Sequence, residues 1–239
     1  MTPLALIVGL GCVPLGTGSS DALVLWSGTV LDDPYLGEDP SALEGGAVVA
    51  VNLDDEDVAV GVESDGSAGS FSIEVPPGLE LAMRISGPEH APTVFRGRAP
   101  EARGLWFNGS LFARQSAPLD AFLAALELPG GGVPSDLSDG AIAHLWVEPA
   151  EPEALAGASF ALVDGAGEPG TLLAFTTTET GALEPADSED PITLILGVDL
   201  APGNVTLGMD SLDGRSAETT WPARGGDLLA GPLFALSAE

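Results

Sequence analysis

Hydrophobic and polar residues alternate along residues 71–86, FSIEVPPGLELAMRIS, on both sides of a Pro-Pro-Gly turn. A period of two places successive side chains on opposite faces of a strand, so this segment predicts a hairpin with one buried face. Shorter apolar runs at 23–30, 47–51 and 58–62 lie between clusters of Asp, Gly and Pro and predict further strands. The hydrophobic positions of the predicted hairpin are Phe71, Ile73, Val75, Leu79, Leu81, Met83 and Ile85.

One stretch, residues 116–127, has the spacing of a helix instead. Ser116 is a suitable N-cap, Pro118 falls in the first turn, and Pro129 with three glycines ends the pattern. Apolar side chains recur in it at i, i+3, i+4 and i+7, and we expect this stripe to pack against a sandwich. The stripe consists of Leu119, Phe122, Leu123 and Leu126.

A weak internal repeat divides the chain. Residues 41–71 align without a gap with residues 153–183, and in each copy a Leu-Trp pair precedes the aligned block and a Pro-Gly pair follows it. We interpret the repeat as a duplicated β-domain, with a single larger sandwich as the alternative. The predicted fold class is mainly β, with two small antiparallel β-sandwiches (prealbumin-like or immunoglobulin-like) and one short amphipathic helix between them. The expected parts are a signal and tether at 1–21, a first sandwich at 22–115, a helix and Gly/Pro linker at 116–140, and a second, diverged sandwich at 141–239.

Small, acidic and aromatic residues stand at characteristic places in the first copy, namely Gly28, Gly45, Asp65, Gly69, Phe71, Pro77 and Gly78. In this pattern the first copy resembles the carboxypeptidase regulatory-like domain, a transthyretin-like sandwich of bacterial secreted and surface proteins. The resemblance implies architectural roles: the glycines turn the chain and the phenylalanine fills the core. It implies no reaction, because modules of this family are usually non-catalytic. The second copy departs from the pattern, with Thr177 at the aspartate and Leu183 at the phenylalanine.

The charge of the chain excludes one class of partner. Asp and Glu number 36 against 7 Lys plus Arg, all of them arginines, which gives a formal net charge of −29. Nucleic acid is bound through clustered Lys and Arg, so we expect no nucleic-acid partner. The 32 glycines and 20 prolines agree with many short strands and turns.

The first residues combine an apolar run with a cysteine. The run, Leu-Ala-Leu-Ile-Val at 4–8, is followed by small residues and then by Cys12, the one cysteine of the chain. This pattern resembles a bacterial lipoprotein signal. The resemblance implies that Cys12 becomes the lipid-bearing first residue and anchors the chain to a membrane, with 13–21 as a flexible tether. The alternatives are a core strand or a secretion signal without lipid; a phosphate-binding glycine loop is disfavoured because Pro14 leaves no room for the helix it needs.

Catalytic chemistry finds little support in the sequence. A single cysteine and two histidines, His90 and His144, provide neither a disulfide nor a standard zinc site, and no G-x-S-x-G motif accompanies either histidine. We therefore expect no enzyme activity and no cofactor. An acid-based hydrolase stays open as a less favoured alternative, because the many carboxylates could form a catalytic pair.

Two groups of residues are candidates for ligand contact. The acidic cluster at Asp54, Asp55 and Asp57 is a weak calcium candidate, although a solvated turn is the simpler interpretation. Among the aromatic residues, Trp106, Phe107 and Trp221 are the candidates for an exposed recognition surface.

These observations together predict a non-catalytic lipoprotein of the bacterial cell envelope, secreted or surface-anchored, with β-sandwich modules for structure or for recognition of an unidentified protein or glycan. A carbohydrate- or calcium-binding adhesion module is the alternative.

Overall fold

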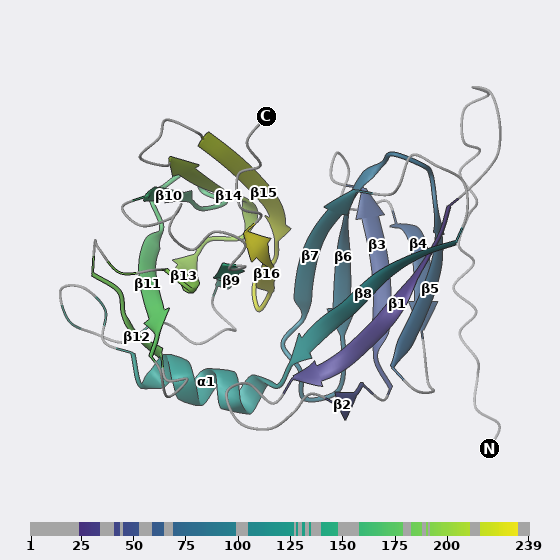
Figure 1. Ribbon diagram of the computed structural model, residues 1–239, viewed down its shortest axis with the longest axis horizontal. Coiled ribbons are helices and arrows are strands. Elements are labelled where there is room, and N and C mark those ends of the chain that lie inside the picture. Colours follow the sequence, from purple (N-terminus) through teal and green to yellow (C-terminus); the bar gives the residue numbers. More distant parts are fainter. Residues whose placement is uncertain are drawn as a thin grey trace, which may run out of the picture.

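A computed structural model of the chain describes residues 24–33, 41–43, 45–52, 59–64, 69–98, 105–126, 128, 131, 134, 140–147, 158–178, 183–187, 190, 192–210 and 216–233. These residues form sixteen strands and one helix, arranged in three sheets (Figure 1). The predicted mainly β class is confirmed.

The N-terminal sheet is built around β1, which pairs antiparallel with β2 and β5 and parallel with β8. The parallel pairing was not expected from the sequence, because the two strands are separated by most of the first half of the chain. The strands of the N-terminal sheet are β1 (Val24–Asp33), β2 (Ser41–Ala42), β5 (Ser70–Val75) and β8 (Leu105–Arg114).

The long sheet has nine strands in the order β12-β11-β13-β9-β16-β7-β6-β3-β4. Its central strand, β16, comes from the end of the described chain and pairs parallel with β7 of the first half and β9 of the second. One continuous sheet therefore runs across the linker that the sequence predicts. Its strands are β3 (Ala47–Asn52), β4 (Ala59–Ser64), β6 (Glu80–Ser86), β7 (Thr93–Arg98), β9 (Ala141–Val147), β11 (Thr171–Thr177), β12 (Leu183–Pro185), β13 (Leu194–Leu200) and β16 (Leu228–Leu233).

The C-terminal sheet consists of three antiparallel strands in the order β10-β14-β15. Its core residues alternate along β14, where Val205, Leu207 and Met209 are buried together with Trp221 of β15. They pack against Val94 and Leu229 of the long sheet. The strands are β10 (Ser159–Val163), β14 (Gly203–Asp210) and β15 (Ser216–Ala223).

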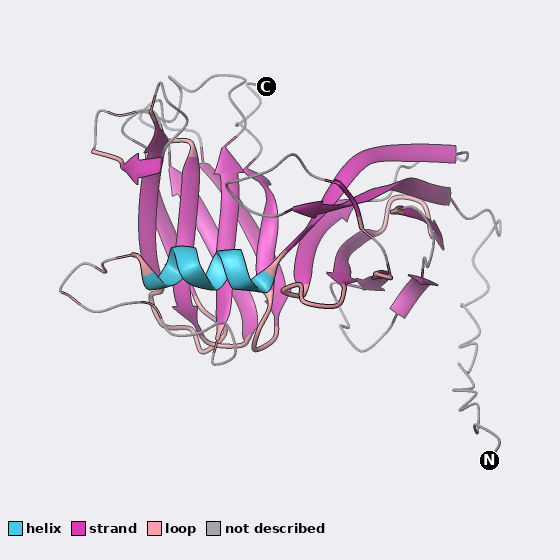
Figure 2. Ribbon diagram, turned by 90° about the horizontal axis from the view of Figure 1, so that it is seen from below, coloured by secondary structure: helices cyan, strands magenta, loops and turns pink. Residues whose placement is uncertain are grey.

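Two elements cover different parts of the opposite face of the long sheet. The N-terminal sheet covers β3 and β6, where Phe71 and Ile73 pack against Leu81 and Met83. Helix α1 (Ser116–Ala124) covers the strands of the second half, and Figure 2 shows it lying across them. Its Leu119 is fully buried in a cluster with residues of β9, β13 and β16, a burial that stabilises the fold by about 1.5–3 kcal/mol.

The predicted hairpin at 71–86 is wrong in its pairing, although its predicted buried positions are buried except for Leu79, which is partly exposed. β5 pairs with β1, whereas β6 pairs with β3 and β7, so the Pro77-Gly78 turn carries the chain from one sheet to the other. Both strands still bury one row of side chains, because two sheets that face each other share one core. Gly78 has φ +70°, a left-handed conformation that glycine adopts without strain.

The two halves do not share one topology. Their strands recur at similar spacing, but β3 pairs with β4 and β6, whereas its counterpart β10 pairs with β14. The aligned residues thus predict where strands begin but not which strands pair.

The N-cap of helix α1 lies one residue before Ser116, the N-cap that the sequence predicts. Gln115, with extended φ and ψ of −62° and 132°, is the N-cap, and Ser116 is already helical. No side-chain hydrogen bond caps this end. The backbone of Gln115 instead forms a bridge with His90, which ties the helix start to the first sandwich.

Candidate ligand-binding groove

The site residues proposed from the sequence fall into three groups. Cys12, Asp65 and the cluster at 54–57 lie outside the described residues. Trp106 and Phe107 lie on β8, paired with Trp26 and Ser27 of β1, and the structure does not describe their side chains. The motif glycines and Phe71 occupy strands and turns of the first sandwich.

Gly69 shows why one motif position requires glycine. Its φ is +58°, and a Cβ atom there would lie 2.6 Å from the carbonyl oxygen of Val30. The backbone of Val30 donates to the Gly69 carbonyl, so the two segments are in direct contact. Phe71 follows on β5, opposite Gly28 of β1, and is buried.

The prediction that Trp221 is exposed is wrong. Only 3% of this residue is exposed, because its position on β15 alternates into the core between the C-terminal and long sheets. Its indole Nε1 has no hydrogen-bond partner within the described part of the chain. Trp221 is therefore a core residue, and only its neighbours on β15 reach the surface groove described below.

His90 holds a junction together. Its Nε2 lies 3.0 Å from Oδ1 of Asp32, and Nδ1 contacts the carbonyl oxygen of Pro88. The Gln115 side-chain amide donates to the same carboxylate, at 2.9 Å to Oδ1 and 3.1 Å to Oδ2. These bonds join β1, the loop after β6 and the start of α1, which gives His90 and Asp32 a structural role.

His144 lies in the interior, on β9 between Leu196 of β13 and Ala230 of β16. The residue is fully buried. Burial, and after it the positive charge of Arg114, hold the pKa of His144 well below its ordinary value of 6.5. The imidazole is accordingly neutral at pH 7.

An ion pair joins the first half to the turn before β16. Nη1 of Arg84 on β6 donates to both carboxylate oxygens of Asp227, at 2.5 and 2.6 Å. Asp227 Oδ2 also accepts the backbone N–H of Arg224 at 2.7 Å. Burial raises the pKa of the Asp227 carboxyl, and the hydrogen bond from Arg84 opposes that shift. The two side chains are 15% and 2% exposed, so the pair is largely shielded from solvent.

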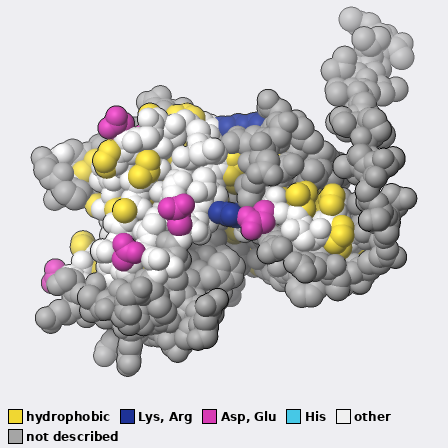
Figure 3. Space-filling model, turned by 90° about the horizontal axis from the view of Figure 1, so that it is seen from above, with side chains coloured by type: hydrophobic (Ala, Val, Ile, Leu, Met, Phe, Trp, Pro, Cys, Tyr) yellow, Lys and Arg dark blue, Asp and Glu magenta, His cyan; other side chains and the backbone are white. Residues whose placement is uncertain are grey.

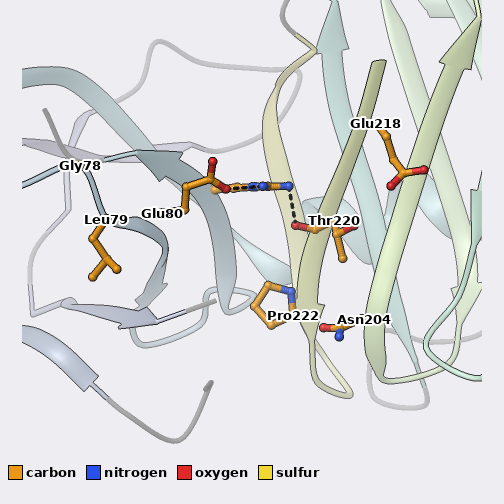
Figure 4. Close-up of a pocket in the computed structure, with 8 residues that line it drawn as sticks. Gly78, Leu79, Glu80, Asn204, Glu218, Thr220 and Pro222 are labelled. Atoms are coloured by element: carbon orange, nitrogen blue, oxygen red, sulfur yellow. Dashed lines mark hydrogen bonds and ion pairs between the residues drawn. The ribbon is translucent and has the colours of Figure 1, made fainter. Parts of the chain in front are cut away.

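A groove of about 530 Å³ lies between the start of β6 with β7 on one side and the edge of the C-terminal sheet on the other (Figure 4). The volume falls within the range of about 300–1,000 Å³ that is usual for small-molecule sites. The described lining residues are Gly78, Leu79, Glu80, Arg96, Asn204, Glu218, Thr220 and Pro222.

Arg96 connects the two walls of this groove. Its Nη2 donates to Oε2 of Glu80 at 2.5 Å, and its Nη1 donates to the backbone carbonyl of Thr220 at 3.3 Å, as the dashed lines of Figure 4 mark. Arg96 is 30% exposed and Glu80 49% exposed, so both reach solvent while they hold this geometry. Figure 3 shows that acidic side chains on the visible face stand apart from one another, with few basic ones among them.

Sequence reasoning missed this groove. Its residues come from four strands and one turn that lie far apart in the chain, and no motif links them. One signal was available, because Glu80 and Arg84 mark the polar face of the alternating strand β6. That face is expected to meet water, whereas much of it meets the second half of the chain.

Within the described ranges, no three His, Cys, Asp or Glu side chains gather in a way that could hold a metal ion. The described helix α1 is too short to be a membrane-spanning candidate, and none was found in that part of the chain.

No family model matches the chain, and no curated protein is similar to it. Among solved structures, it is similar to the Bacillus anthracis TIE protein, with 8% identity and a TM-score of 0.30; the match covers 88% of this chain and 34% of that one. It is also similar to a variant of the shaft pilin SpaA from Lactobacillus rhamnosus GG, with 10% identity, 90% and 100% coverage and a TM-score of 0.30. The tip fimbrial protein Mfa3 from Porphyromonas gingivalis gives 6% identity, 85% and 83% coverage and a TM-score of 0.28. TM-scores this low do not establish a shared topology.

Proposed function

We propose that the chain is a non-catalytic lipoprotein of the bacterial cell envelope, anchored through Cys12, whose β-sandwich body serves as a recognition module. The observation that carries this proposal is the continuous long sheet, which makes the two halves one scaffold and leaves a groove at their junction. A rigid scaffold that presents polar side chains in a groove is suited to binding.

The positions of both histidines support the non-catalytic part. His144 is fully buried within the long sheet, and His90 contacts Asp32 and Pro88 next to the start of α1. General-base catalysis requires an imidazole within hydrogen-bond reach of a bound substrate. Neither histidine lines the groove.

The architecture of the first half supports the resemblance to carboxypeptidase regulatory-like domains. Gly69 and Gly78 adopt left-handed conformations and Phe71 fills the core, as the family pattern implies. Membership of that family is part of the proposal, as is the location at the cell envelope.

Metabolic labelling tests the anchor. The full gene is expressed in a bacterium fed an alkyne fatty acid, and labelling and intact N-terminal mass are measured for the wild type and for Cys12→Ala. We expect label on a chain that begins at Cys12, and loss of both label and processing in the variant. An unlabelled wild-type chain that retains Met1 would contradict the proposal.

A panel of glycoside and ester substrates tests the absence of catalysis. We expect no turnover above that of buffer. Turnover that disappears when a single carboxylate is neutralised would instead favour the acid-based hydrolase.

A further inference from the structure

We propose that the groove between β6, β7 and β15 binds a neutral polyhydroxylated ligand, specifically a short oligosaccharide. This inference rests on the proposed recognition function, for which it names the ligand class and the residues in contact. The hydrogen-bonding capacity of the lining, its charge and the state of the sheet edge beside it point to this ligand class.

The lining presents donors and acceptors side by side. Arg96 has five N–H groups and can donate further bonds beyond those to Glu80 and Thr220, and the Asn204 amide can both donate and accept. The carboxylates of Glu80 and Glu218 only accept. A sugar hydroxyl donates one hydrogen bond and accepts others, so a ligand rich in hydroxyls matches this mixture of groups.

The charge of the groove disfavours anionic ligands. Two carboxylates, Glu80 and Glu218, and one guanidinium, Arg96, line it, and the whole chain carries a net charge of −29. Anions such as phosphate or sulfated sugars meet repulsion from the carboxylates and from the chain as a whole. Arg96 already pairs with Glu80, so the charge disfavours anions only, and the mixed donors and acceptors of the lining favour a ligand rich in hydroxyls among the remaining classes.

The edge of β15 is closed to an extended peptide. β15 is the edge strand of the C-terminal sheet, a position at which a peptide could add as a further strand. The Thr220 carbonyl, however, already accepts a hydrogen bond from Arg96, and Pro222 has no N–H to donate. The groove therefore retains side-chain contacts and lacks the backbone ladder that a peptide strand needs.

The groove also has an apolar part. Leu79, from the turn before β6, is half-buried and lines one wall of the groove, whereas Pro222 of β15 on the opposite wall is buried (Figure 4). Sugar rings have apolar C–H faces that pack on such surfaces, with their hydroxyls directed to the polar groups between them.

The test uses the full-length chain on an array of defined neutral and anionic glycans, with a peptide array beside it. Affinity for the bound glycans is then measured by calorimetry. The variants are Glu218→Gln and Asn204→Ala, both at exposed positions, together with Arg96→Gln; the matched control is Glu74→Gln, at an exposed position of β5. Melting temperature is recorded for every variant to identify any that unfold.

We expect retention of neutral glycans, with affinity reduced by about tenfold or more in Glu218→Gln and Arg96→Gln and unchanged in Glu74→Gln. Retention of peptides or of anionic glycans alone, or of no glycan at all, would overturn the inference. So would neutral-glycan binding that all folded groove variants retain. The labelling of Cys12 is measured separately, so loss of the anchor and loss of the ligand site are distinguishable.

Discussion

Replacement of His144 by leucine should abolish part of the pH dependence of stability. His144 is fully buried between Leu196 and Ala230, and burial together with Arg114 keeps its pKa well below 6.5. In the unfolded chain the imidazole is exposed and titrates near its ordinary value of about 6.5. Leucine provides a side chain that carries no proton in either state.

The sign and size of the effect follow from this difference in pKa. Below about pH 6.5 the unfolded state binds a proton at His144 that the folded state does not bind. The free energy of unfolding is therefore highest above that pH and decreases as the pH falls. The loss grows by roughly 1.36 kcal/mol for each pH unit below the unfolded pKa and stops growing once the pH falls through the lowered folded-state pKa. His144→Leu should lack this loss.

The assay is urea unfolding followed by tryptophan fluorescence between about pH 5 and pH 8, with the free energy of unfolding extrapolated to water. The measured quantity is the difference in slope between wild type and variant, because carboxylates and termini titrate in both. His90→Gln is the matched control, since it removes the other histidine of the chain.

Equal pH slopes in the wild type and His144→Leu would refute the assignment of a buried, neutral His144. A slope that disappears in His90→Gln but persists in His144→Leu would refute it equally, because the pH dependence would then not come from His144.

Three further substitutions test the packing of the scaffold by the same unfolding assay. Arg84→Met should cost about 3–5 kcal/mol because it leaves the Asp227 carboxylate buried without its partner, and adding Asp227→Asn should recover part of the loss; no recovery would contradict the pairing. Gly69→Ala should cost about 1–3 kcal/mol and more than Gly45→Ala, since both have positive φ but only Gly69 would place its Cβ against a backbone carbonyl, at 2.6 Å; equal costs would argue against that contact. Leu119→Ala should cost about 2–5 kcal/mol, because the side chain is fully buried beneath α1; a cost below 1 kcal/mol would mean that the helix is not docked.

Burial along strands could be predicted from the sequence, but pairing could not. The alternation of 71–86 identifies Phe71, Ile73, Leu81 and Met83 as core residues, and all four are buried. The same alternation results whether the two strands are neighbours in one sheet or face each other across a core. Only contacts with distant strands, such as β5 with β1, decide between the two.

The position of β16 illustrates a second limit. Its residues 228–233 read as an ordinary apolar strand at the end of a second sandwich, yet they complete the long sheet between β7 and β9. Nothing local distinguishes a strand that ends one domain from a strand that joins two. The candidate groove could not be predicted for the same reason, since it exists only where the halves meet.

The geometry of the groove depends on a contact outside it. Glu80 and Arg84 lie on the same face of β6, and Arg84 holds Asp227 in the turn that connects β15, a wall of the groove, to β16. Breaking this ion pair frees one wall relative to the other without changing any lining residue. If the groove is already formed before binding, Arg84→Met should lower its affinity for the ligand in proportion to the fraction of molecules in which the two walls separate. Bound ligand, which contacts both walls, should restore part of the lost stability.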